Sequence, residues 1–323
     1  MRPFPALRGH VITGPKTPAR GPTRALERRL GDWARARLPR GLVDFTMFTL
    51  KQGWACLFGA LMLAAILVSH AIWQPGWAIQ RYDALFLFAI VTQILFLALR
   101  LESWAEVRVI ALFHLTGTVM EIFKVDAGSW AYPEPGFFKL MGVPLFSGFM
   151  YASVGSYMAR AIRIFDMRFQ PYPPFWVTML LAGAIYVNFF AHHFLPDIRW
   201  GLFAATVLIY GRTLIRFRLT RWYFMPLPVA AFLTSLFLWI AENIGTMTGT
   251  WLYAGQATLD RVSFAKIGSW YLLLYVSFVT VTLANRRVIA LDQFAHPHDP
   301  DGDRAQNQQA EQDAGRDADR AAL

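Results

Sequence analysis

Eight long apolar stretches constrain this chain more than any other feature of its sequence. Each is close to the roughly 20 residues that a helix needs to cross a hydrocarbon core about 30 Å thick. Of the 323 residues, 55% are hydrophobic and 16% are charged, whereas a soluble domain carries about 25% charged residues. The sequence therefore predicts an all-α, polytopic membrane protein. The stretches lie near residues 53–72, 84–100, 106–123, 143–162, 174–195, 198–215, 224–243 and 268–285. The second and sixth are short of strictly apolar residues, which leaves seven spans as the alternative.

The distribution of basic residues predicts which side of the membrane each loop faces. With eight spans the two termini share a side, and 25 of the 31 Lys and Arg residues lie there, including helix-end arginines such as Arg160. Because basic loops stay in the cytoplasm, both termini are expected inside. The net charge of +10 is then a topology signal, and no nucleic-acid partner is expected. The six basic residues of the outer side are Arg81, Lys124, Lys139, Arg199, Arg261 and Lys266.

Four segments follow from these patterns. Residues 1–45 form a basic cytoplasmic tail, in which Leu26, Leu30 and Trp33 recur at helical spacing among arginines. That pattern is typical of an amphipathic helix on anionic lipid, with a solvated, topology-setting tail as the alternative. Residues 46–165 and 166–290 are expected to be two four-helix membrane repeats, and residues 291–323 a disordered tail. The single cysteine, Cys56, excludes an internal disulfide.

An internal repeat with an offset of 121 residues supports the two halves. Each copy contains a glutamate near the outer end of a span, followed by a loop with glycine, a small hydroxyl residue, tryptophan and tyrosine. A tandem pair of units with an even number of spans has a pseudo-twofold axis along the membrane normal. The matching residues are Glu121, Gly128, Ser129, Trp130 and Tyr132 in the first copy, and Glu242, Gly249, Thr250, Trp251 and Tyr253 in the second.

The duplicated glutamates are the candidate catalytic residues. A charged acid within a span costs roughly 2.5–3.5 kcal/mol on insertion scales, which makes Glu121 and Glu242 candidates for proton exchange. The glycines permit a tight reversal, and the Trp and Tyr residues suit an interface with one apolar and one wet side. One interpretation is an outer-leaflet pocket lined by both copies, which would bind a lipid or an isoprenoid. The alternative is an aromatic belt that only closes two helical hairpins.

Other polar residues gather at the same predicted depth. His114 lies two helical turns before Glu121, and Asn188 lies one turn before His192, so we include all three as candidate binding residues. His70, His192 and His193 are weak candidates for a metal site, because imidazole is a ligand for zinc or iron. No paired-histidine metal motif occurs on any one helix, so hydrogen-bonded interface histidines are the favoured interpretation. We expect neither a metal nor a cofactor.

Small residues on the fourth span predict close helix packing. Gly148 and Gly155 share a stripe with Ser147, Ser153 and Ser156. Small residues let the backbones of two membrane helices approach each other. The stripe therefore indicates a tight contact with a neighbouring span.

Several motifs resemble those of a known family. The segments Met120–Val125, Gly128–Glu134, Gly142–Tyr151 and Arg160–Arg163 are similar to the signature of the bacterial integral-membrane family DUF817, also called YoaT-like. The resemblance covers roughly residues 40–290. It implies a multi-pass protein of the inner membrane and no particular activity.

A weaker resemblance concerns membrane carotenoid hydratases and heterodimer-type lycopene cyclases. It is carried by Glu242–Thr246, Thr248–Gly249, Tyr253 and Gly142–Pro144. The sequence departs from the cyclase pattern, in which a Pro-x-Glu-Glu motif supplies paired acids, because Leu145, Phe146 and Ser147 follow Pro144.

Three functions remain open at this point. An enzyme would use a protonated Glu121 or Glu242 for redox-neutral acid catalysis on an isoprenoid or lipid, with the aromatic rings stabilising the cation. A transporter would use the same acids as proton carriers for a small molecule. A structural or assembly protein would use the motif only to close hairpins. The sequence does not determine the oligomeric state.

Overall fold

The computed structural model of this protein describes residues 37, 39–74, 76–192, 194–255 and 261–284. The predicted amphipathic helix near residue 30 and the predicted disordered tail both lie outside these residues. The chain divides into two units, residues 1–48 and 49–323. The helix α2 (Arg40–Ala55) begins in the first unit and ends in the second. The candidate residues, apart from His193, lie among the described residues of the second unit.

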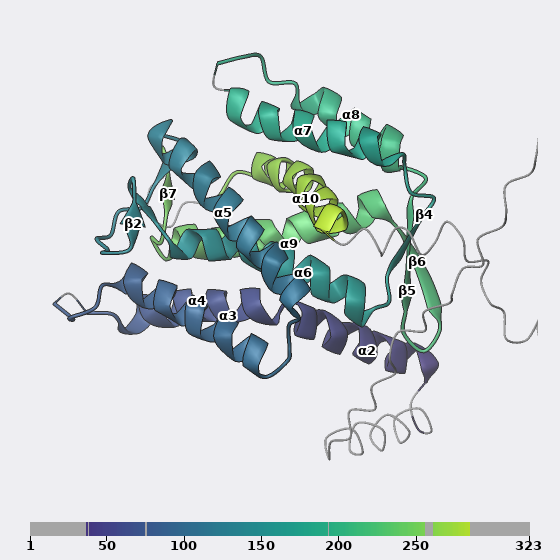
Figure 1. Cartoon of the computed structure of the whole chain (residues 1–323), viewed down its shortest axis with the longest axis horizontal. Helices are drawn as coiled ribbons and strands as arrows, with labels where there is room; N and C mark the ends of the chain where they lie inside the picture. Colours follow the sequence, from purple (N-terminus) through teal and green to yellow (C-terminus); the bar gives the residue numbers. More distant parts are fainter. Residues whose placement is uncertain (1–36, 38, 75, 193, 256–260, 285–323) are drawn as a thin grey trace, which may run out of the picture. The chain divides into compact units, whose positions relative to one another are not determined.

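Helices account for most of the second unit (Figure 1). The order of the helices matches the eight predicted spans, although the boundaries move by several residues. They are α3 (Leu57–Ile72), α4 (Arg81–Ala98), α5 (Trp104–Asp126), α6 (Phe146–Ile164), α7 (Phe175–Ala191), α8 (Arg199–Tyr210), α9 (Leu227–Met247) and α10 (Ala265–Ala284).

The fold is mostly helical, and the described residues also form three small antiparallel sheets. One joins β1 (Trp130–Ala131) to β7 (Leu252–Tyr253), and one joins β2 (Lys139–Leu140) to β3 (Val143–Pro144). The third contains β4 (Arg168–Gln170), β5 (Leu214–Arg218) and β6 (Trp222–Pro226). These strands replace the end of the sixth predicted span and the start of the seventh, because aromatic and branched residues around the Arg218–Trp222 turn form a hairpin.

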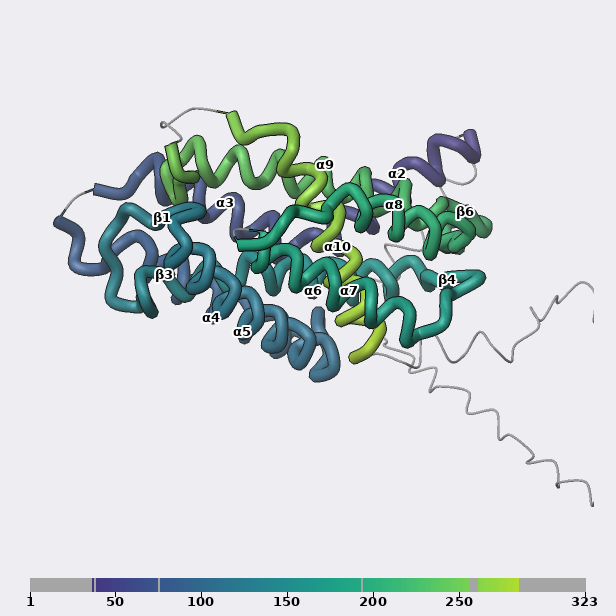
Figure 2. Tube along the Cα trace, turned by 90° about the horizontal axis from the view of Figure 1, so that it is seen from above, coloured from purple at the N-terminus to yellow at the C-terminus, as the bar shows by residue number. Residues whose placement is uncertain are grey.

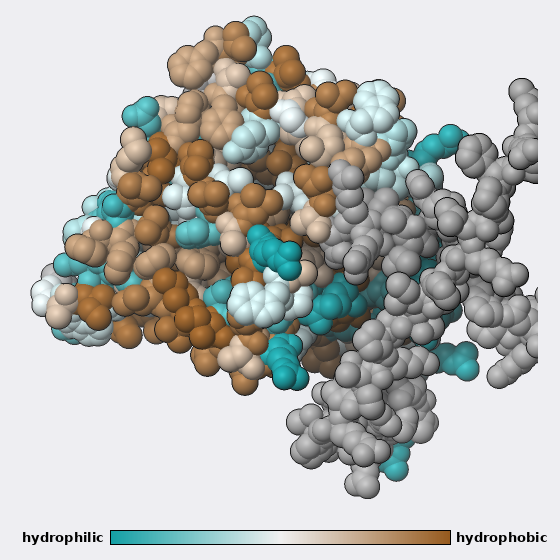
Figure 3. All heavy atoms as spheres, in the orientation of Figure 1, coloured by the Kyte–Doolittle hydropathy of each residue, from teal (hydrophilic) through white to brown (hydrophobic). Residues whose placement is uncertain are grey.

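Among the described residues, three helices are long and apolar enough to cross a membrane, namely α4, α9 and α10. The pair α2 and α3, bent by 67° at the break near Cys56, makes up to a fourth span. The helices α7 and α8 are apolar but shorter. On α4 and α9, large apolar side chains such as Val91, Ile94 and Phe237 are exposed. Figure 3 shows apolar residues over much of one face of the described part. These features indicate a helical membrane protein.

The helices α5 and α6 are also long, but they carry several charged residues. They pack very closely, as the glycine stripe predicts. A Cβ added to Gly117 would lie 2.7 Å from the ring of Tyr151, and one added to Gly155 would lie 2.8 Å from the ring of Phe113. At Gly148 an added Cβ would collide with Thr118 and His114. The small residues therefore allow the contact between α5 and α6.

One buried and one partly exposed ion pair stabilise the ends of α5 and α6 that lie away from the motif loops. Arg160 is fully buried, and its guanidinium lies 3.2 Å from a carboxylate oxygen of the equally buried Glu102. It also donates a hydrogen bond of 3.1 Å to the carbonyl oxygen of Trp54, at the break between α2 and α3. Arg163 pairs with Glu106 at 2.9 Å. Arg160 therefore stabilises the helix break.

Candidate functional site

The two motif loops leave their helices in the same way. At the end of α5, the N–H of Gly128 donates to the carbonyl of Val125 at 3.0 Å and that of Ser129 to Lys124 at 2.9 Å. At the end of α9 the residues 121 positions later repeat both bonds, at 3.0 Å each. The φ angles are +68° at Gly128 and +63° at Gly249, a left-handed conformation that other residues rarely adopt. Glycine therefore ends both helices with the same cap, which is of the Schellman type.

The carboxylate of Glu121 is buried, with 3% of the residue exposed. It accepts hydrogen bonds from the indole N–H of Trp130 at 2.7 Å, the hydroxyl of Tyr132 at 2.8 Å and the hydroxyl of Tyr151 at 2.5 Å. The first two donors come from the motif loop, and Tyr151 comes from α6. Hydrogen bonds to a carboxylate are stronger than those between neutral groups, so this acid is held firmly in place.

The carboxylate of Glu242 is held in a similar way, with 6% of the residue exposed. The hydroxyl of Tyr253, which corresponds to Tyr132, donates to it. The indole N–H of Trp270, on α10, donates a bond of 2.6 Å to its other oxygen. Each glutamate thus receives a hydroxyl from its own loop and an aromatic donor from the following helix. Burial raises the pKa of the Tyr132 and Tyr253 hydroxyls well above the ordinary value, which keeps both tyrosines as donors.

The side chains of the two motif tryptophans, Trp130 and Trp251, have different surroundings in the structure. The ring of Trp251 lies where a Cβ at Gly245 would be, and it packs against the core of the first half. The position equivalent to Gly245 in the first copy is Lys124, whose side chain leaves no such room. Trp130 instead turns its indole N–H to Glu121. A difference of one residue on the helix therefore explains why Trp270, and not Trp251, donates to Glu242.

Contacts between the copies join the two glutamates into one site, to which we give the name paired-glutamate site. Strand β1 pairs with β7, with Trp130 opposite Tyr253. The rings of these residues are 5.8 Å apart, and one donates to Glu121 while the other donates to Glu242. The second contact joins Tyr151 and Trp270, whose rings are 6.4 Å apart and which donate to Glu121 and Glu242 respectively. Two aromatic contacts therefore link the two buried carboxylates.

Two lysines lie beside the site. The ammonium of Lys266, at the start of α10, lies 3.8 Å from the centre of the Tyr253 ring, and it attracts the carboxylate of Glu242. The ammonium of Lys124, one turn after Glu121, donates 2.6 Å to the carbonyl of Phe189 and lies 4.2 Å from its ring centre. The positive charge of Lys266 therefore lies over the ring of Tyr253, whose hydroxyl donates a hydrogen bond to Glu242.

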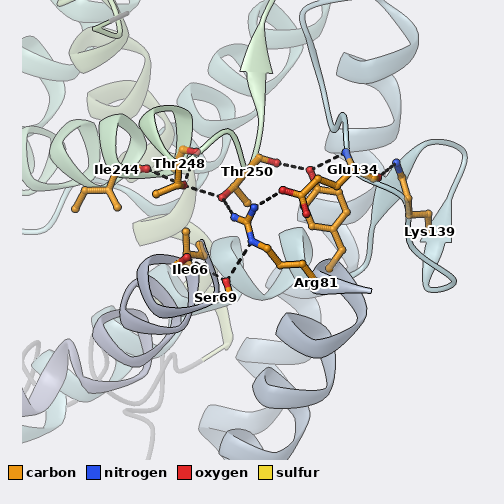
Figure 4. A network of polar contacts seen from close by, with 10 residues as sticks. Ile66, Ser69, Arg81, Glu134, Lys139, Ile244, Thr248 and Thr250 are labelled. Atoms are coloured by element: carbon orange, nitrogen blue, oxygen red, sulfur yellow. Dashed lines mark hydrogen bonds and ion pairs between the residues drawn. The ribbon is translucent and has the colours of Figure 1, made fainter. Parts of the chain in front are cut away.

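A network around Arg81 connects the first helices to both motif loops (Figure 4). The buried Arg81 guanidinium forms an ion pair with Glu134, donates to the Thr250 hydroxyl at 2.6 Å, and donates to Ser69 at 3.2 Å. The hydroxyl of Tyr82 donates to the carbonyl of Thr250 at 2.7 Å. Because Glu134 follows the first motif and Thr250 belongs to the second, this network stabilises the two loops relative to each other.

The other candidate binding residues, His114, Asn188 and His192, lie in different parts of the second unit. His114 lies on α5, with its ring 4.4 Å from that of Phe149. The Asn188 side chain bonds to Asp197 at 3.1 Å and accepts from the N–H of Ile198 at 3.1 Å, so it shapes the turn between α7 and α8. The Nδ1 atom of His192 lies 3.2 Å from the carbonyl of Asn188. The structure connects none of these three to the glutamates through a hydrogen bond between described residues.

The described residues contain no group of three or more His, Cys, Asp and Glu side chains arranged for a metal ion. His70 is exposed, and His193 lies outside the described residues. Among the described residues, no imidazole donates a hydrogen bond to Glu121 or Glu242. The donors are indole N–H and phenol hydroxyl groups.

Sequence reasoning missed Tyr151 and Trp270. Tyr151 belongs to the Gly142–Tyr151 segment of the family signature, which was a signal for importance but gave no role. Trp270 had no such signal, because an aromatic residue on an apolar helix is typical of a core position. The ion pair between Arg81 and Glu134 was also missed, since loops of different spans bring these residues together.

Comparison with known proteins places the chain in a family. The model of the family described as protein of unknown function, DUF817, matches residues 44–278. The uncharacterised protein YoaT of Bacillus subtilis (strain 168) is 41% identical over 244 residues, which are 75% of this chain and 92% of that protein. No solved structure matches the chain. The segments that resemble the DUF817 signature include Glu121, Trp130, Tyr132 and Tyr151 of the paired-glutamate site, and the chain belongs to the DUF817 family.

Proposed function

We propose that this protein is a proton-coupled small-molecule transporter of the bacterial inner membrane, in which Glu121 and Glu242 bind the coupling protons. The observation that carries the proposal is the pair of aromatic contacts that links the two buried carboxylates. Ionisable residues inside membrane proteins are costly, and they commonly mark ion and proton pathways. A proton bound at one glutamate would change hydrogen bonds that reach the other.

The proposed architecture contains eight spans in two tandem repeats, with both termini in the cytoplasm. Several features support it. The order α3–α6 is followed by α7–α10, and α5 and α9 end 121 residues apart, at Asp126 and Met247. The motif loops and the sheet β4–β5–β6 lie at opposite ends of the second unit (Figure 1). Transporters with repeats bind the substrate between the two halves, and residues from both halves contribute to the paired-glutamate site, which supports the proposal.

A transport function explains the hydrogen-bond donors to Glu121 and Glu242 better than a structural role in closing hairpins does. A loop that merely closes a hairpin needs donors from its own residues. Here Tyr151 and Trp270 come from the following helices, and their rings contact each other. Protonation of Glu121 would weaken its bonds to Tyr151, and the contact with Trp270 would transmit that change to Glu242. Such a coupling between α6 and α10 is what alternating access needs.

A lipid or isoprenoid enzyme is the second candidate. It is favoured by the aromatic rings that surround the two acids, since ring faces stabilise a carbocation as they do any cation. In that function one glutamate would protonate an alkene, and the resulting carbocation would lose a proton from a neighbouring carbon to the other glutamate, so that the reaction is redox-neutral. The ligand would enter from the outer leaflet.

A deletion strain complemented with variants distinguishes these functions. Wild-type protein should restore proton-dependent uptake from a panel of labelled solutes, whereas Glu121→Gln and Glu242→Gln should not, at equal expression. Asp126→Asn serves as the control, because Asp126 is an exposed carboxylate at the end of the same helix as Glu121. Uptake by both glutamine variants would contradict the proposal. An altered lipid profile with unchanged uptake would favour the enzyme, and loss of folding in both variants would favour a structural role.

A further inference from the structure

The substrate class follows from the charge and the aromatic rings of the paired-glutamate site. Two carboxylates, from Glu121 and Glu242, are surrounded by the indole and phenol rings of five residues. Carboxylates repel anions, and ring faces attract cations. A ligand with a positive charge and an apolar body matches both features.

The protein itself shows that a cation fits at this place. The ammonium of Lys266 lies 3.8 Å from the centre of the Tyr253 ring, within the range of a cation–π contact. The same ring is 5.8 Å from that of Trp130, and its hydroxyl donates to Glu242. An aliphatic ammonium is therefore already held by a ring that belongs to the paired-glutamate site.

The corresponding lysine of the first copy has a different environment. Lys139 follows the first motif as Lys266 follows the second, but its ammonium donates to the carbonyls of Tyr132 and Glu134, at 3.1 and 3.0 Å. It lies 5.7 Å from the nearest ring centre, that of Tyr82. Backbone carbonyls thus hold Lys139, whereas the ring face of Tyr253 holds Lys266. The two lysines form a matched pair for an experiment.

We infer that the paired-glutamate site binds lipophilic organic cations, such as quaternary ammonium or phosphonium compounds, and that Lys266 is the resident cation which they displace. The inference rests on the proposed transport function and specifies its substrate. The bound cation would take the place of the Lys266 ammonium over Tyr253 and beside Glu242. No covalent step is involved.

Tetraphenylphosphonium binding to the purified full-length protein tests this inference. The expected result is saturable binding that Lys266→Met tightens about tenfold, because the competing charge is removed, and that Tyr253→Leu weakens by a similar factor. Lys266→Arg should keep the wild-type affinity, since it keeps the charge. Lys139→Met is the matched control and should also leave the affinity unchanged. Tetraphenylborate, of the same shape and opposite charge, should not bind.

Three results would overturn the inference: absence of tetraphenylphosphonium binding, equal binding of tetraphenylborate, or an effect of Lys266→Met that Lys139→Met reproduces. Lys266→Gln is measured alongside and should behave like Lys266→Met, so the test survives if the methionine variant does not fold. If tetraphenylphosphonium fails to bind while Glu121→Gln and Glu242→Gln still abolish proton-dependent uptake, the inference is wrong and the proposed function stands. If those variants retain the uptake, the proposed function itself is wrong.

Discussion

Single residues explain both what the sequence predicted at the site and what it did not. Glu121, Trp130 and Tyr132 were expected together, and the structure joins them by hydrogen bonds. Trp251 has the same place in the motif as Trp130, yet it packs on Gly245 and makes no such bond to Glu242. A repeat reports equal spacing along the chain, but the neighbours of each side chain in space differ between the copies. His114, Asn188 and His192 shared a predicted depth with the glutamates, and depth alone did not bring them into the hydrogen-bonded group.

From the sequence, Arg160 was expected only to act as a topology signal, because its partner Glu102 comes from another part of the chain. The buried ion pair between them leads to a stability prediction. Removing one partner of a buried ion pair costs about 3–5 kcal/mol, whereas an exposed pair contributes at most about 1 kcal/mol. Arg160→Met should therefore lower the free energy of unfolding in detergent by about 3–5 kcal/mol. Arg163→Met, at a pair whose arginine side chain is 52% exposed, should cost less than about 1 kcal/mol.

The double variant Arg160→Met with Glu102→Gln provides the control for this measurement. Part of the cost of Arg160→Met comes from the uncompensated charge of Glu102, so neutralising that acid should recover stability. Equal losses for Arg160→Met and Arg163→Met would show that Arg160 acts only as a topology signal.

At the scale of elements, apolar stretches and small residues predicted which helices form and which of them pack closely, but not where each helix ends. Each of the eight apolar stretches contains a helix, and the glycine stripe of α6 lies against α5 as expected. Strand β5 was missed because Leu214 and Ile215 continue the apolar run of the sixth predicted span, and an apolar run alone does not separate a strand from the end of a helix. The pairing of β1 with β7 was also missed, because strands of two residues carry no periodic signal.

Alanine substitutions at two glycines should change the free energy of unfolding in opposite directions. One glycine lies in the contact between α5 and α6, and the other lies on α7. Gly117→Ala would push the Tyr151 ring away from Glu121, and such overpacking costs about 1–3 kcal/mol. Gly183, in the middle of α7, has nothing within 4 Å of an added Cβ. Gly183→Ala should therefore stabilise the protein by about 0.5–1 kcal/mol through helix propensity. Denaturant unfolding of both variants in detergent measures this difference, and destabilisation by Gly183→Ala would contradict it.

For the molecule as a whole, composition predicted a helical membrane protein and sequence motifs predicted the family. Within the part of the chain that the structure describes, three helices, or four with the bent pair, are both long and apolar enough to span a membrane. The other helices were expected to span the membrane as well, and two properties separate them from α4, α9 and α10. The helices α5 and α6 contain charged residues such as Glu121 and Arg160, which are buried against partners, and α7 and α8 are short. Figure 2 shows α10 among the other helices, and it packs against α6, α7 and α9.

The orientation predicted from the basic residues gives a test at this scale. Reporter fusions that end at residue 136, in the first motif loop, should be active only on the outer side of the membrane. Fusions that end at residue 220, in the turn between β5 and β6, should be active only in the cytoplasm. Activity of both fusions on one side would contradict the arrangement of eight spans.

Whether the two motif loops meet in one site is the central question, and a disulfide measures it directly. Ala131 and Leu252 are opposite each other in the pair β1–β7, where Cα atoms are about 4.5–5.5 Å apart, a separation that a disulfide can bridge. In a protein with Cys56→Ser, mild oxidation of Ala131→Cys with Leu252→Cys should give a rapid intramolecular cross-link. The pair Ala131→Cys with Leu214→Cys, in which residue 214 lies on β5, should give none. A cross-link no faster in the first pair than in the second would show that the two glutamates belong to separate sites.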